Sequence, residues 1–147
     1  MRKSTICLAV VLMCAWVSSF GQSNGLPQWK VVKEFHVTGR TESVGPITLF
    51  TPTKQGFYRV GLYISAFTNV HQDSGWNSSV AWTDRTGLIG TILTTTDLHN
   101  GNSYSAVGPQ IFSPQPGTPI LFFVQAATPP PHDATYDIEL NIEKLTH

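Results

Sequence analysis

Residues 56–67 constrain the fold of this chain more than any other segment, because they read as one long strand with apolar side chains on both faces. Side chains alternate along a strand, so Phe57, Tyr63 and Phe67 share one face and an aliphatic and aromatic series occupies the other. We predict that the second series enters a sandwich core and that the first face meets another surface. The core-facing series is Tyr58, Val60, Leu62, Ile64 and Ala66.

The amino terminus reads as a secretory leader. A basic start at residues 2–3 precedes an apolar run over residues 6–17, and small residues lead up to Gly21, where a signal peptidase would cleave. The apolar run is shorter than the roughly 20 residues that a membrane-spanning helix needs. A retained amino-terminal anchor is the alternative, and lipidation of Cys14 is disfavoured because Met13 precedes it.

The leader sets the expected domain organisation. We predict a signal peptide over residues 1–21, a flexible lead-in over 22–28 and a single β-sandwich domain over 29–147, secreted to the periplasm or the extracellular space without membrane insertion of the mature chain. Both cysteines, Cys7 and Cys14, lie in the leader, so we expect neither a disulfide nor a thiolate metal site. Seven basic residues then face nine acidic ones without forming a basic stripe, which argues against nucleic-acid binding.

The chain consists of short apolar runs separated by turn residues, a pattern typical of an all-β fold. One predicted turn lies at residues 44–46. Eight such runs suit a two-sheet antiparallel sandwich. A jelly roll is favoured over an immunoglobulin-type Greek key, because the Cys…Trp…Cys spacing of the latter is missing. The predicted strands are residues 29–37, 47–50, 56–68, 79–83, 88–95, 104–112, 119–125 and 135–145.

The spacing of Phe50, Gly56, Tyr58 and Val60 resembles the central signature of complement-type globular heads, which belong to the tumour-necrosis-factor-like jelly-roll superfamily. Val60 stands where that family prefers phenylalanine. The same stretch is similar to small secreted bacterial β-domains with a Gly-x-Tyr-Arg-Val strand. The first resemblance implies a compact homotrimer whose inner sheets meet around a threefold axis, with ligand-binding loops at one end.

A second apolar segment, residues 120–124, also points large side chains both ways and indicates self-association independently of the resemblance. A patch of this size is seldom left in water on a monomer. The alternative is that loops or the segment around Trp29 cover both faces within one chain. The predicted subunit interface comprises Phe57, Tyr63, Phe67 and either Phe122 or Phe123.

The last predicted strand alternates apolar residues with an acidic face that includes Asp137, Glu139 and Glu143. Such a column would repel itself around a threefold axis unless it bound a cation, and Asp137 and Glu139 have the oxygen ligands that calcium uses. The alternative is a solvated face that protects the strand from aggregation. The same pair has the spacing of glycosidase carboxylates, but nothing else indicates a sugar-cleaving cleft.

The loop over residues 69–79 is the predicted ligand site, because it places an aromatic ring among hydrogen-bonding side chains, an arrangement that suits a glycan. A surface protein is the other expected partner. The alternative for Trp76 is that it folds back to cap the sandwich. The candidate ligand-binding residues are Gln72, Asp73, Trp76, Asn77 and Tyr104.

Enzyme signatures are missing, including the nucleophile elbow, the zinc-protease helix motif and glycine-rich phosphate loops. Three local pairs could form an acid–base or metal site only if the fold brought them together. We therefore predict a non-catalytic binding or structural domain, with a carbohydrate-binding module and, after it, a hydrolase as alternatives. The pairs are His71 with Asp73, Asp97 with His99, and His132 with Asp133.

Overall fold

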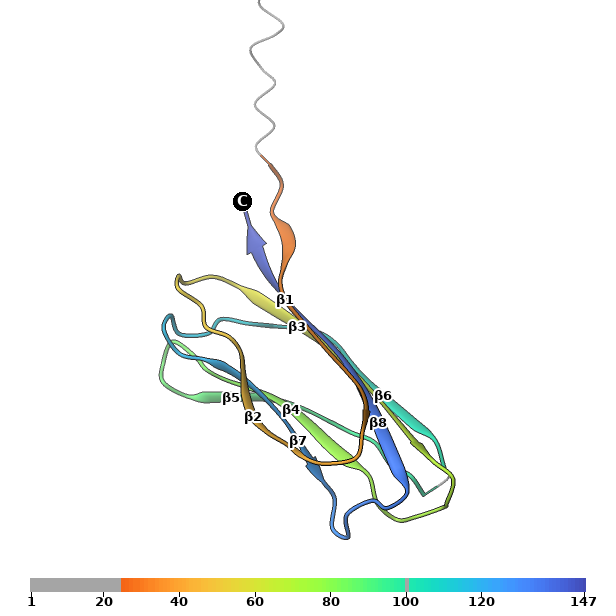
Figure 1. Cartoon of the computed structure of the whole chain (residues 1–147). Helices are drawn as coiled ribbons and strands as arrows, with labels where there is room; N and C mark the ends of the chain where they lie inside the picture. Colours follow the sequence, from red (N-terminus) through yellow and green to blue (C-terminus); the bar gives the residue numbers. More distant parts are fainter. Residues whose placement is uncertain (1–24, 100) are drawn as a thin grey trace, which may run out of the picture.

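The computed structural model describes residues 25–99 and 101–147, which form two stacked antiparallel sheets (Figure 1). The predicted leader and the start of the lead-in lie outside the described residues. Nothing in the described part of the chain is a helix long and apolar enough to cross a membrane. The strands are β1 (Gln28–Arg40), β2 (Val44–Phe50), β3 (Tyr58–Thr68), β4 (Trp76–Thr83), β5 (Ile89–Thr95), β6 (Ser103–Phe112), β7 (Ile120–Ala126) and β8 (Ala134–Thr146).

The strands follow the order of a jelly roll. One sheet has the order β1-β8-β3-β6 and the other has the order β2-β7-β4-β5. The first strand pairs with the last, the second with the seventh, the third with the sixth and the fourth with the fifth, so the chain is one long hairpin wound into two sheets. This confirms the predicted all-β sandwich, and its winding is that of a jelly roll.

All eight predicted strands are present, but two begin three residues earlier than predicted, β2 at Val44 and β4 at Trp76. The turn predicted over residues 44–46 is wrong, because these residues belong to β2. The register against β7 shifts between Val44 and Ile47, which lets the chain bend there without leaving the sheet. Pro46 is tolerated because β2 is an edge strand.

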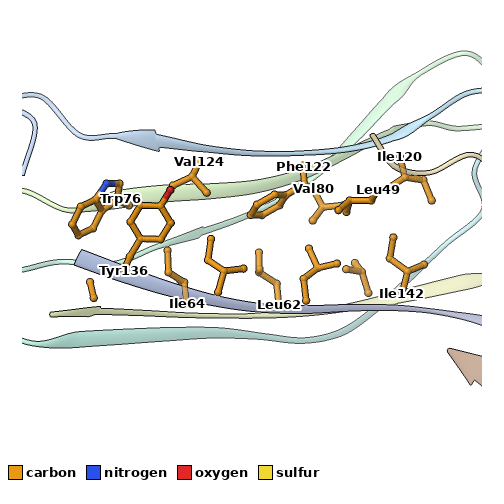
Figure 2. Packing of buried hydrophobic residues seen from close by; sticks show 14 of the residues in the cluster. Leu49, Leu62, Ile64, Trp76, Val80, Ile120, Phe122, Val124, Tyr136 and Ile142 are labelled. Carbon is orange, nitrogen blue, oxygen red and sulfur yellow. The ribbon is translucent and has the colours of Figure 1, made fainter. Parts of the chain in front are cut away.

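The core is a band of side chains between the two sheets (Figure 2). The inward residues of β3 and β8 alternate as predicted, and each is at most 4% exposed. Figure 2 shows Trp76 and Tyr136 at one end of this band and Ile120 and Ile142 at the other. The confirmed inward residues are Tyr58, Val60, Leu62, Ile64 and Ala66 on β3 and Tyr136, Ile138, Leu140 and Ile142 on β8.

The indole of Trp82 requires a glycine on the neighbouring strand. Trp82 pairs with Gly90 of β5, and its ring centroid lies 4.4 Å from that of Phe112. A Cβ atom at Gly90 would lie 2.4 Å from Cε2 of Trp82, well inside van der Waals contact. The side chain of Trp82 is therefore fixed from two directions.

We expect Gly90→Ala to lower the free energy of unfolding by about 1–3 kcal/mol, because the indole must move out of its packed position. Gly108→Ala on β6 is the matched control. A Cβ there meets no atom within 4 Å, so its effect should stay within about 0.5 kcal/mol. Urea denaturation of both variants measures the difference, and equal effects would contradict the packing described for Trp82.

Candidate functional site

The solvent-facing side of the β1-β8-β3-β6 sheet carries the largest group of exposed aromatic residues. We call it the aromatic face and define it by Phe57, Tyr63, Phe67 and Tyr104, which are 55%, 39%, 44% and 75% exposed. Tyr104 on β6 pairs with Ser65 of β3, so it shares a side with Tyr63. The two tyrosine rings stack with centroids 6.4 Å apart and planes 27° apart. Phe57, Tyr63 and Phe67, predicted to share one face of this strand and to meet another surface, are exposed in the single chain.

A groove of about 460 Å³ crosses the aromatic face, and all four strands of the sheet line it. Its floor is low because Gly61 of β3 and Ala106 of β6 have little or no side chain. A Cβ at Gly61 would lie 2.6 Å from Oδ1 of Asn141, which accepts a hydrogen bond from the Gly61 backbone N–H at 3.1 Å. Gly61 is therefore needed for this polar contact as well as for the depth of the groove.

Each carboxylate along β8 contacts a partner within the chain. Glu143 forms an ion pair with Arg59, and Oε1 of Glu139 lies 4.0 Å from Nδ1 of His36. The hydrogen bond to Glu143 raises the pKa of the Arg59 guanidinium. Asp137 accepts a hydrogen bond from the Gly39 N–H at 2.7 Å. The acidic column is thus partly neutralised before any second molecule approaches.

The arrangement of acidic residues does not indicate a calcium site. Asp137 and Glu139 bind groups of β1, and no three His, Cys, Asp or Glu side chains within residues 25–99 and 101–147 gather closely enough to hold a metal ion. Calcium normally takes six or more oxygen ligands, and these two side chains supply few of them.

Phe123 does not belong to the aromatic face, and this corrects the predicted interface. It lies on β7 in the other sheet, opposite Ser79 of β4, while its neighbour Phe122 points into the core and is fully buried. The outward residues of the two sheets face opposite directions, so Phe123 is half-buried on the far side of the sandwich from Tyr63. A single flat contact cannot cover both residues.

Loop residues 69–75, 96–99, 101–102 and 127–133 gather at the end of the sandwich away from Gln28 and Thr146, which pair with each other at the opposite end. The predicted ligand residues here tie the loops together. The Gln72 amide donates to the His132 carbonyl at 2.8 Å and accepts from the His132 N–H at 2.9 Å. Asn77 accepts a hydrogen bond from the Thr95 hydroxyl at 2.8 Å. These amides are engaged within the chain.

The prediction that Trp76 offers a platform for a sugar ring is wrong. Trp76 is the first residue of β4, is 0% exposed, and packs its ring against Tyr136 with centroids 4.9 Å apart. The alternative, in which Trp76 caps the sandwich, describes its position. Among the five predicted ligand residues, Tyr104 is the aromatic side chain that remains exposed.

The fold joins the histidine-containing loops in a combination that the local pairs did not predict. Asp73 hydrogen-bonds Nδ1 of His99 across two loops, and this contact raises the pKa of His99. Nδ1 of His71 lies 3.2 Å from the His99 carbonyl oxygen, whereas His132 and Asp133 form the predicted local pair at 3.6 Å. Asp73 and His99 are both well exposed, so this pair stands at the surface rather than in a catalytic cleft.

Comparisons with known proteins give no family. No family model and no curated protein matches the chain. Among solved structures, the chain is similar to the VP2 subviral particle of infectious bursal disease virus, with 14% sequence identity and a TM-score of 0.36. The match covers 84% of this chain and 33% of the viral chain, so this chain spans about a third of that protein's length.

We expect Trp76→Ala to lower the free energy of unfolding by about 3–5 kcal/mol, because it empties the end of the core against Tyr136. Tyr104→Ala, at a residue that is 75% exposed, is the control and should change it by about 0.5 kcal/mol or less. Guanidinium denaturation provides both values. A Trp76→Ala protein as stable as the parent would show that the indole is not part of the core.

We expect the stability contributed by the Asp73–His99 pair to be fully present below pH 6.5, the ordinary pKa of histidine, and to be lost as the pH rises through the raised pKa of His99. Asp73→Asn should lower that pKa, because it removes the charge that favours the imidazolium ion. NMR titration of the His99 ring protons tests this. Asp133→Asn, beside His132, is the control that should leave the His99 titration unchanged.

Proposed function

We propose that this protein is a secreted, non-catalytic jelly-roll module that works as a homotrimer, with the aromatic face as the contact between subunits. In this arrangement the β1-β8-β3-β6 sheets of three copies meet around a threefold axis. The assembled trimer presents the end of each sandwich that carries the Asp73–His99 pair, opposite Gln28 and Thr146, to a surface protein or glycan. Two further parts of the proposal are membership of the superfamily that residues 50–60 resemble and secretion directed by a leader over residues 1–21.

The observation that carries this proposal is that Phe57, Tyr63, Phe67 and Tyr104 are all exposed on one side of one sheet, with the rings of Tyr63 and Tyr104 in contact. Large aromatic side chains dominate the energetics of protein interfaces, and a monomer gains nothing by holding four of them in water. The Tyr63 and Tyr104 rings already stack on each other, so less side-chain freedom remains to be lost on association. Closed rotational symmetry is the usual outcome when identical subunits associate.

The internal pairing of the β8 carboxylates supports the same face. A bare column of Asp137, Glu139 and Glu143 repeated around an axis would oppose assembly through like-charge repulsion. Arg59 and His36 place positive or protonatable groups beside two of these carboxylates, and Gly39 donates to the third. Hydroxyl groups at the ends of Tyr63 and Tyr104 suit an interface of mixed polarity, because they keep a polar handle on a large apolar ring.

We expect light scattering to give the purified parent protein the mass of a trimer or of an assembly of trimers. Phe67→Lys should abolish association through the aromatic face at micromolar concentration, because three lysines would then meet an apolar contact. Thr48→Lys is the matched control, since Thr48 is exposed on β2 in the other sheet. Unchanged circular dichroism would show that both variants fold. A monomeric parent protein, or equal behaviour of the two variants, would overturn the aromatic face as the contact.

A further inference from the structure

Strand β5 is an edge that lacks the features by which the other edges avoid pairing with another chain. Natural proteins protect exposed edges with charges, prolines and bulges. Strand β1 has Lys30, Lys33 and register shifts, while β2 has Pro46 and β6 has Pro109, each strand again with a register shift against its partner. Strand β5 has no charged residue and no proline, and its pairing with β4 runs without a shift from Thr83–Ile89 to Asn77–Thr95.

The side chains of β5 are exposed to an unusual degree for apolar residues. Ile89 and Leu93 are 76% and 60% exposed, and Leu88 beside the strand is 68% exposed. Among the described strands, β5 forms a ladder with β4 alone, so its second row of backbone N–H and C=O groups faces away from the sheet. An extended segment can add to such an edge through main-chain hydrogen bonds.

We propose that β5 pairs antiparallel with β5 of a second copy, about a twofold axis at Thr91. This register joins two β2-β7-β4-β5 sheets into one continuous sheet. Side chains on one face meet side chains on the same face only if the paired residue numbers sum to an even value. One residue therefore lies directly opposite its own copy, and the axis passes between the two. With Thr91 on the axis, Ile89 of each copy lies opposite Leu93 of the other.

The pattern of side chains about Thr91 carries the choice of a second copy as the partner. Directly opposed side chains on one face of an antiparallel pair contact each other, and here the two exposed aliphatic residues, Ile89 and Leu93, lie two positions on either side of the axis. The same register brings the turn over residues 84–88 of one copy beside residues 96–98 of the other. Arg85 and Asp97, both exposed, then approach each other twice across the axis.

This contact is independent of the aromatic face, because the two surfaces belong to different sheets. If both contacts form, pairing at β5 links trimers into a larger assembly. If only the β5 contact forms, the parent protein is a dimer. The two proposals can therefore fail separately, and a light-scattering mass for each variant distinguishes them.

The test is a charge exchange at the axis in the full chain, measured by size-exclusion chromatography with light scattering. Thr91→Lys places two lysines directly opposite each other, and Thr91→Glu places two glutamates there. Either substitution, combined with Phe67→Lys in one chain, should halve the measured mass from that of a dimer to that of a monomer. An equimolar mixture of the two double variants should restore the dimer, because opposite charges then face each other. Thr48→Lys, on the other edge of the same sheet, is the matched control and should leave the dimer intact.

Thr91 is exposed, so a lysine or glutamate at this position points into solvent in the monomer. The substitutions should therefore leave the fold of the monomer intact, and a change in mass reports on the contact. A Phe67→Lys protein that is already monomeric at about 100 µM, a concentration well above the dissociation constants of weak specific pairs, would overturn the proposal. So would a dimer whose mass survives Thr91→Lys, or capture of a different partner at β5 with no self-association. Loss of the dimer in both single-charge variants together with its recovery in the mixture would support the stated register.

Discussion

The pairing of β3 with β8 is the contact on which the rest of the structure depends. It runs without a shift from Tyr58–Lys144 to Thr68–Ala134 and joins segments that are far apart in the sequence. This ladder occupies the middle of its sheet and supplies two parallel rows of buried side chains to the core. Because side chains alternate, committing these rows to the core commits every intervening residue to the aromatic face. The aromatic face is thus a direct consequence of how the core is built.

The same register decides the electrostatics of that face. Arg59 pairs with Glu143 and Tyr63 with Glu139 across the β3–β8 ladder, so the β8 carboxylates stand beside a guanidinium and an aromatic ring rather than in isolation. Exposed ion pairs contribute little to stability, and we assign the Arg59–Glu143 pair no large share of it. Its consequence is for association, since a second molecule meets a face whose charge is already balanced in part.

The sequence predicted the architecture well because the period-2 pattern of β3 and β8 is clean, and it failed where that pattern is interrupted. Strand β4 points Trp76, Ser78 and Val80 inward, and the buried serine interrupts the apolar pattern, so the sequence alone predicts a loop at Trp76. The sequence alone groups Phe123 with Tyr63, because alternation shows which side of a sheet a residue faces but not which sheet its strand joins. The Asp73–His99 contact joins two loops that meet only after the jelly roll is wound.

The two proposed contacts use different physics, which explains how one small domain can carry both. The aromatic face offers side chains, so its specificity depends on the shape of Tyr63, Phe67 and their neighbours. The β5 edge offers backbone groups, and in the proposed dimer its specificity comes from register, because a slipped pairing would no longer place the exposed Ile89 opposite the exposed Leu93. The full chain has a formal net charge of zero and residues 22–147 one of −2, so long-range repulsion between copies is weak. Under the second proposal, association at the sheet edges is controlled locally by whether an edge carries a charge or a bulge, and β5 is the edge of the described sheets that carries neither.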